Sequence, residues 1–127
     1  MRWHIVLALA AVLSCASACL DALKPAELLP GAVPFTPPES FDGWWANMET
    51  CSHLTADYGR VSWYYIPGGG FDCPTEGGNC DGMWQPPHTI YLAHERMNDS
   101  VLVEHEMLHD LIQRGDHPPV FDFCGVR

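Results

Sequence analysis

Residues 101–114 read VLVEHEMLHDLIQR and contain the pattern H-E-x-x-H, formed by His105, Glu106 and His109. On a helix, residues four apart lie on one face about one turn apart, so the two imidazoles can converge on one ion. Zinc binds neutral imidazole in a tetrahedral site, and a catalytic zinc keeps one position for water. Glu106 is offset towards that water and can take its proton. The segment therefore predicts a zinc site with Glu106 as general base.

The residues around the motif favour a helix. Good N-cap residues, Asn98, Asp99 and Ser100, stand immediately before it, and Gly115 suits the C′ position after it. One side of this helix is apolar, through Leu102, Leu108, Leu111 and Ile112. The two histidines flank that side, so we expect them to face inward or into a cleft. The alternative is a pair of core histidines that binds no metal.

The spacing leaves the third metal ligand open. Two protein ligands alone would make a looser site than catalytic zinc usually has. His117 is the first choice, because Gly115 can reverse the chain and bring that side chain back to the helix. A surface turn is the alternative role for His117. The upstream alternatives as ligands are His88, His94 and Glu95.

Residues 103–111, VEHEMLHDL, resemble the active-site helix of zincin-type metallopeptidases, and the resemblance covers about residues 88–117. It implies an α+β fold with a minimal zincin-like core: an N-terminal helix, a short antiparallel sheet and a C-terminal HExxH helix. It also implies an edge strand that holds extended substrate by main-chain pairing, and Thr89–Ala93 is placed to be that strand. Glu104 and Asp110 are charged where the peptidases usually carry uncharged residues, and Asp110 is a candidate to orient a ligand histidine. Three tyrosines are candidate oxyanion donors: Tyr64, Tyr65 and Tyr91.

Periodicity predicts the other elements. Apolar residues spaced by three and four over 41–54 indicate an amphipathic helix that begins near Ser40. Residues 60–66 alternate and are rich in aromatic and β-branched types, which is typical of a strand. Residues 67–87 form a long Gly-rich loop, and Val120–Cys124 is expected to pack back as an extended tail.

The N-terminal segment predicts export. A short basic start, an apolar run over 5–13 and small residues after it describe a signal peptide over 1–18. A lipoprotein-type signal with cleavage before Cys15 or Cys19 is an open alternative, as is a membrane anchor, although the run is shorter than the roughly 20 residues a span needs. Residues 19–40 are Pro-rich and are expected to form a tether, which leaves 41–127 as the zincin-like domain.

Export permits disulfides, and Cys51, Cys73, Cys80 and Cys124 allow three pairings. We favour Cys73–Cys80, which closes the Gly-rich loop, and Cys51–Cys124, which ties the tail to the first helix. A Cys₄ metal site is the alternative, but a spacing of six residues between two cysteines lacks the usual knuckle.

A net charge of −10 with only six Lys and Arg residues argues against nucleic acid and anionic membrane surfaces as partners. The predicted function is a zinc-dependent metallopeptidase that cleaves a peptide or protein substrate, using a zinc-activated water and Glu106 as general base. The protein is expected to be exported, either secreted or lipid-anchored in the cell envelope. A non-catalytic metal-binding envelope lipoprotein and a structural envelope protein without metal are the alternatives. Oligomeric state is left open.

Overall fold

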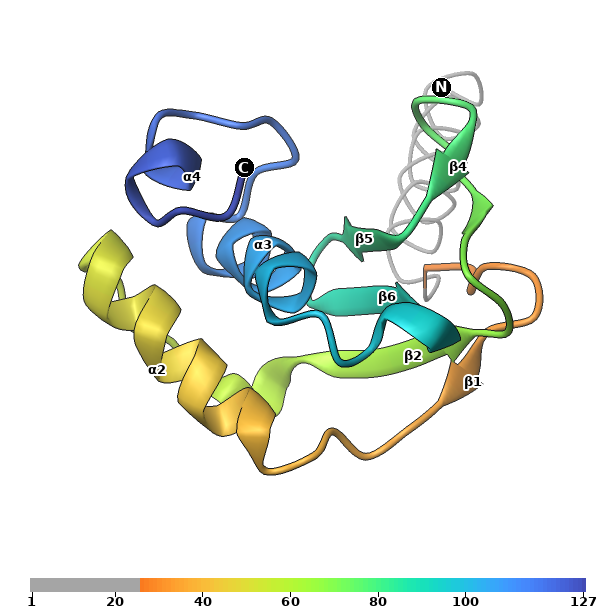
Figure 1. Ribbon diagram of the computed structural model, residues 1–127, viewed down its shortest axis with the longest axis horizontal. Helices are drawn as coiled ribbons and strands as arrows, with labels where there is room; N and C mark the ends of the chain where they lie inside the picture. The colour runs from red at the N-terminus through yellow and green to blue at the C-terminus, as the bar shows by residue number, and fades with distance from the viewer. Residues whose placement is uncertain (1–25) are drawn as a thin grey trace, which may run out of the picture.

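The computed structural model describes residues 26–127, and Figure 1 shows their arrangement. The predicted signal peptide, its two cleavage sites at Cys15 and Cys19 and the first part of the tether lie outside these residues. The described chain mixes helices with a four-stranded sheet and a two-stranded sheet, which confirms the α+β class. No helix within it is long and apolar enough to cross a membrane.

The main sheet has the strand order β1-β2-β6-β5. Its members are β1 (Val33–Pro34), β2 (Ser62–Ile66), β6 (Thr89–Ala93) and β5 (Gly82–Gln85). The sheet is mixed, because β2 and β6 run parallel while β1–β2 and β6–β5 run antiparallel. A short antiparallel sheet is present separately, as the pair β3 (Phe71–Asp72) and β4 (Asn79–Cys80).

The strand over Thr89–Ala93 has the predicted bounds but the wrong place in the sheet. It lies inside, between β2 and β5, and its four last residues are buried. The edge strand beside the motif helix is β5 instead. This strand lies in residues 67–87, which were predicted to form a loop, and that prediction was wrong for residues 82–85.

Two helices pack against one face of the main sheet and against each other: α2 (Ser40–Ser52) and α3 (Ser100–Ile112). Both were predicted from apolar spacing. Alternate residues of the strands point to these helices, as Trp63, Ile90 and Leu92 do. The helices contribute the buried residues Phe41, Trp45, Met48, Val103, Met107, Leu108 and Leu111 to the same core. Removal of these side chains from water is the main stabilising term, at roughly 1.5–3 kcal/mol for each fully buried large one.

Both ends of α3 have a clear physical cause. The Asp99 carboxylate accepts a hydrogen bond from the Leu102 N–H at 3.2 Å, as expected for an N-cap. The left-handed residue that ends the helix is Gln113, with φ 55°, and its N–H bonds to the His109 carbonyl. The prediction that Gly115 takes this position was therefore wrong by two residues.

The opposite face of the sheet carries a second, smaller core of Ile66, Phe71, Tyr91 and Ala93. Leu29 and Ala32 from the Pro-rich segment pack against it. Further along this segment, β1 pairs with β2, and Phe35 joins an aromatic group with Phe41 and Trp63. The described part of the expected tether is therefore built into the fold.

The chain after α3 crosses back over that helix (Figure 1). The short helix α4 (Val120–Phe123) stands where an extended tail was predicted, and that prediction was wrong. Its Phe121 is fully buried, which explains why the segment turns inward. The described chain also contains two short 3₁₀ helices, η1 (Tyr58–Arg60) and η2 (His94–Arg96).

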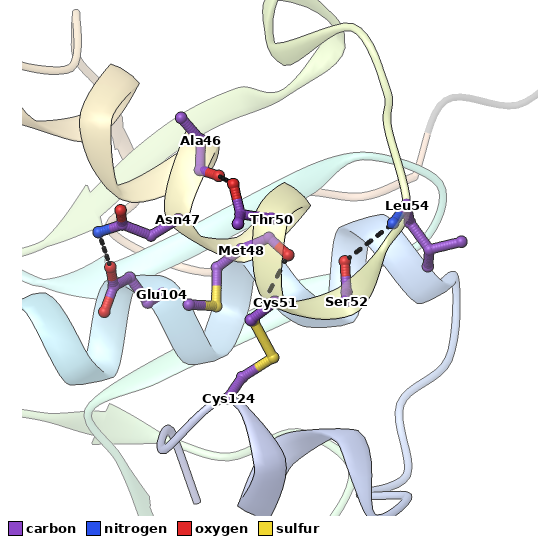
Figure 2. Close-up of a disulfide and its surroundings, with 9 residues drawn as sticks. All are labelled: Ala46, Asn47, Met48, Thr50, Cys51, Ser52, Leu54, Glu104 and Cys124. Carbon is purple, nitrogen blue, oxygen red and sulfur yellow. Dashed lines mark hydrogen bonds between the residues drawn. A yellow bond between two sulfur atoms is a disulfide. The ribbon is translucent and has the colours of Figure 1, made fainter.

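Both predicted disulfides are confirmed. Cys73–Cys80 closes the β3–β4 hairpin, and Cys51–Cys124 joins the end of α2 to the end of α4 (Figure 2). Figure 2 also shows Asn47 of α2 donating to the Glu104 carboxylate of α3 at 3.1 Å. Helix α2 is thus joined covalently to the C-terminal segment and by a hydrogen bond to α3.

Candidate metal centre

Helix α3 places His105 and His109 on the same side, one turn apart. Their Nε2 atoms lie 3.2 Å from each other. The spacing of four residues places both side chains on one face of the helix, because successive turns of a helix stack their side chains.

The chain reversal after α3 brings His117 to the same point. Its Nε2 lies 3.0 Å from that of His105. Arg127 donates to the His117 carbonyl at 3.2 Å and so holds this part of the reversed chain. The ligand atoms of the three histidines all lie within 4.8 Å of one another, so this cluster could hold a metal ion.

The backbone fixes which nitrogen of each α3 histidine carries the proton. His105 Nδ1 lies 2.6 Å from the Val126 carbonyl oxygen, and His109 Nδ1 lies 2.6 Å from that of Arg114. A carbonyl only accepts, so each Nδ1 must donate. In the neutral ring the lone pair is then on Nε2, which points into the cluster.

This arrangement fits a divalent cation. Two ligands at roughly 2.0–2.1 Å from a tetrahedral ion lie about 3.3–3.4 Å apart. The two measured Nε2 separations, 3.2 and 3.0 Å, are close to that value. Lone pairs that converge at such distances repel one another unless a proton or a cation lies between them. Imidazole nitrogens are also common ligands of zinc, whereas magnesium and calcium prefer oxygen ligands.

An aromatic ring forms one wall of the cluster. The ring centroid of Phe121 lies 4.8 Å from that of His105, 4.6 Å from that of His109 and 4.9 Å from that of His117. Burial lowers the pKa of His109 to about 4 and also lowers that of His105. Both rings are therefore neutral at pH 7, which is the form that binds metal.

The upstream candidates for the third ligand lie elsewhere. His88 Nδ1 is 3.0 Å from the Asp110 carboxylate, and the His94 ring packs on Tyr65 with centroids 4.8 Å apart. Glu95 is an exposed residue of η2. Among the described residues, the grouping that suits a metal is the one that contains His117.

Glu106 lies beside the cluster and is only 5% exposed. It approaches the edge strand closely: a Cβ added at Gly82 would lie 2.9 Å from the Glu106 Oε1. Burial raises the pKa of Glu106 to about 8, although the Trp84 backbone N–H, which bonds to the carboxylate, works in the opposite direction. A carboxyl group with this pKa can both accept and donate a proton near neutral pH.

Two open cavities meet at His105, Glu106 and Gly82, which line both. One of about 400 Å³ contains the histidine cluster, with Met83 and Trp84 as its apolar wall. The other, of about 560 Å³, extends towards Arg96 and Arg127 and is more polar. A substrate chain could therefore pass over Glu106 along β5.

The outer edge of β5 faces this passage. The Ala93 N–H donates to the Asp81 carbonyl at 2.7 Å, and these residues stand opposite each other by extension of the register. Ladder bonds in an antiparallel pair occur at alternate residues, so Gly82 and Trp84 direct their N–H and C=O groups away from β6. Those groups are available to Glu106 or to a bound peptide.

Asp110 forms no hydrogen bond to His105, His109 or His117, so it does not orient a candidate ligand histidine directly as predicted. Its fully buried carboxylate accepts from the Arg60 guanidinium at 2.9 and 2.6 Å and from the Trp84 indole N–H at 3.1 Å. His88 completes the set. The candidate oxyanion donors Tyr64, Tyr65 and Tyr91 do not line either of the two cavities.

Gly82, Trp84 and Phe121 lie at the site but were not predicted as site residues. A signal was present for the first two: residues 82–85 and Thr89–Ala93 are apolar runs joined by only Pro86, Pro87 and His88, which is typical of a hairpin. Phe121 gave no signal, because its contact with the histidines depends on the fold of residues 114–121.

Comparison of the chain with protein-family models, with curated proteins and with solved structures finds no match. The site therefore has to be interpreted from its own geometry and chemistry.

Proposed function

We propose that the protein is a zinc-dependent hydrolase of peptide bonds, of the zincin type, with His105, His109 and His117 as ligands. The observation that carries the proposal is the convergence of three imidazole Nε2 atoms beside a buried glutamate on an open cavity. Three histidines leave one tetrahedral position free, which is the pattern of catalytic zinc. The exposed His117 lies at the mouth of this cavity.

Zinc in this position supplies Lewis acidity for the scissile carbonyl and for water. Glu106 removes a proton from the attacking water and later delivers it to the leaving amine. Phe121 packs against the three rings. Burial favours the neutral form of the two helix histidines, His105 and His109, and strengthens electrostatic interactions around them.

The outward main-chain groups of β5 support a peptide as substrate. An extended peptide can add to an unpaired strand edge through main-chain hydrogen bonds, which recognise the backbone and not one side chain. Gly82 and the Trp84 carbonyl offer such groups next to Glu106, whose carboxylate takes the Trp84 N–H. In the predicted scheme this role belonged to Thr89–Ala93, and it now passes to β5.

The two disulfides suggest an oxidising, extracellular compartment. Export through the N-terminal signal, with lipid attachment at Cys15 or Cys19 as the envelope-bound form, is part of the same proposal. Mass spectrometry of the mature N-terminus tests it: an acylated cysteine supports the anchored form, and an unmodified N-terminus after cleavage supports secretion.

Metal analysis of the purified protein is the decisive experiment. We expect about one zinc per chain, and we expect His109→Ala to lose it. Glu106→Gln should retain zinc and lose peptide hydrolysis, because the amide cannot accept the proton. Zinc retained unchanged by His109→Ala would remove the site, and hydrolysis by Glu106→Gln would remove Glu106 as the general base.

A non-catalytic metal-binding protein is the second candidate. The deep burial of Glu106 favours it, because a carboxyl that is 5% exposed has little room for water and substrate together. A zinc-loaded parent protein that cleaves no member of a peptide library would support this candidate over the peptidase.

A further inference from the structure

Trp84 contacts the candidate metal site through its ring. The indole lies over the His109 imidazole, with ring centroids 6.2 Å apart and an interplanar angle of 14°. Phe121 also packs against His109, at 4.6 Å between ring centroids and with an interplanar angle of 49°. The imidazole therefore contacts two aromatic side chains from different elements, β5 and α4.

The indole is itself fixed by a buried hydrogen bond. Its Nε1–H donates to the Asp110 carboxylate at 3.1 Å. Asp110 is fully buried, and Arg60 holds the other oxygen of the same carboxylate. A carboxylate with this set of donors has one favourable orientation, and the Trp84 ring takes its orientation from it.

The main chain of the same residue faces the general base. The Trp84 N–H bonds to the Glu106 carboxylate across the outer edge of β5. Close contact between Gly82 and Glu106 keeps strand and helix together at this point. Trp84 is thus linked to a metal ligand through its ring and to the catalytic carboxylate through its backbone.

We propose that Trp84, anchored by Asp110, is the positioning residue that holds the His109 ring and the Glu106 carboxylate in fixed relation to each other. The inference rests on the proposed metal site and extends it. Phenylalanine at position 84 would fill most of the space but has no N–H for Asp110. Its ring would then be free to turn, and the face presented to His109 would no longer be fixed.

Trp84→Phe is the test, and Trp45→Phe is its matched control. Trp45 is a buried tryptophan of α2, 4% exposed, and its indole nitrogen has no hydrogen-bond partner among the described residues. Both substitutions remove the same atoms from a tryptophan that packs on the main core, Trp84 being partly buried and Trp45 buried, but only the first breaks a bond to Asp110. Zinc affinity of each variant is measured by competition with a chromophoric chelator.

Loss of an outer partner of a metal ligand typically weakens binding by about 10–100-fold, and we expect that range for Trp84→Phe. We expect less than about a threefold change for Trp45→Phe. With Co²⁺ as a spectroscopic probe of the three-histidine site, the visible absorption bands should shift in Trp84→Phe and stay as in the parent in Trp45→Phe. Asp110→Asn should reproduce the shift through the same ring.

Equal zinc affinity in the parent and Trp84→Phe, with unchanged Co²⁺ bands, would overturn the inference and leave the metal site intact. Equal losses in Trp84→Phe and Trp45→Phe would also overturn it, because the effect would then be general packing. A parent protein that binds neither metal would overturn both the metal site and this inference.

Discussion

Glu106 is the residue whose ionisation is most altered by the fold. Its pKa is raised to about 8 by burial, so the folded, metal-free protein keeps a proton that the unfolded chain releases near pH 4.5. The protonated Glu106 contributes to the free energy of unfolding. This contribution is fully present below pH 4.5 and is lost as pH rises through 8. His109 acts in the opposite sense at lower pH, because its pKa of about 4 makes its contribution present above 6.5 and lost on acidification.

Between pH 6.5 and 8, the titration of Glu106 therefore determines how the unfolding free energy changes with pH. We expect the unfolding free energy of the metal-free parent to fall with rising pH, by up to about 1.4 kcal/mol per pH unit. Glu106→Gln has no carboxyl to titrate and should show a much flatter profile. Urea unfolding at several pH values in the presence of a chelator measures this, and parallel profiles for the two proteins would contradict the assignment.

Gly82 is predicted to control the position of the general base. A Cβ there would lie 2.9 Å from Glu106 Oε1 and 3.1 Å from Leu102 Cδ1, so Gly82→Ala must displace the carboxylate. We expect zinc content to be kept and kcat for peptide hydrolysis to fall by at least about tenfold, since small misplacements of a reacting group are costly. Gly43→Ala, where a Cβ meets nothing within 4 Å, is the control and should keep the parent rate.

The site residues that could be predicted from the sequence are those that lie close together in the chain. His105, Glu106 and His109 lie on one helix, and the periodicity of a helix alone predicts how they face. Gly82, Trp84 and Phe121 belong to the site through contacts between distant segments. A hairpin pattern marks the first two as strand residues, but no local pattern places any of the three beside the histidines. His117 was an intermediate case: a chain reversal was predictable, but its direction depended on Gln113 and on the burial of Phe121.

At the level of elements, the segment after α3 completes the candidate site. It provides the His117 side chain, the Arg114 and Val126 carbonyls that fix the two helix histidines, and the Phe121 wall. Only one disulfide, Cys51–Cys124, ties this segment covalently to α2. Metal binding should therefore depend on that bond.

We predict that the double variant Cys51→Ser, Cys124→Ser loses about 2–5 kcal/mol of stability, because the bridge closes a long loop. Zinc affinity should fall with it, at least tenfold. The variant Cys73→Ser, Cys80→Ser frees a short hairpin that carries no ligand, so its zinc affinity should stay near that of the parent. Chelator competition on both variants compares them, and a larger zinc loss in the hairpin variant would refute the role given to the C-terminal segment.

The elements that the sequence predicted well are those with strong periodicity, namely α2, α3, β2 and β6. Strand β5 was missed because its four residues begin with glycine and are followed by two prolines, which are typical of a loop. Helix α4 is only four residues long, too short for a helical repeat to be visible. The edge position of β5 could not be found either, since strand order is set by tertiary packing.

Across the whole molecule, the metal is expected to act on stability as well as on chemistry. The ligands come from α3 and from the segment after it, so an ion bound by all three favours the folded state alone. Zinc at about 100 times its dissociation constant should add about 2.7 kcal/mol. For a domain of this size that raises Tm by roughly 10–20 °C. Thermal unfolding with and without zinc checks it, and His109→Ala should show no such rise.

The position of the C-terminal segment also bears on how the protein is made. A chain that crosses a membrane N-terminus first delivers α3 before residues 114–126, so both helix histidines arrive without His117 and without their carbonyl partners. Oxidation of Cys51 with Cys124 then ties that segment to α2, the helix that packs beside α3. Maturation would thus load the ion late, at its destination, from whatever metal the surroundings there provide.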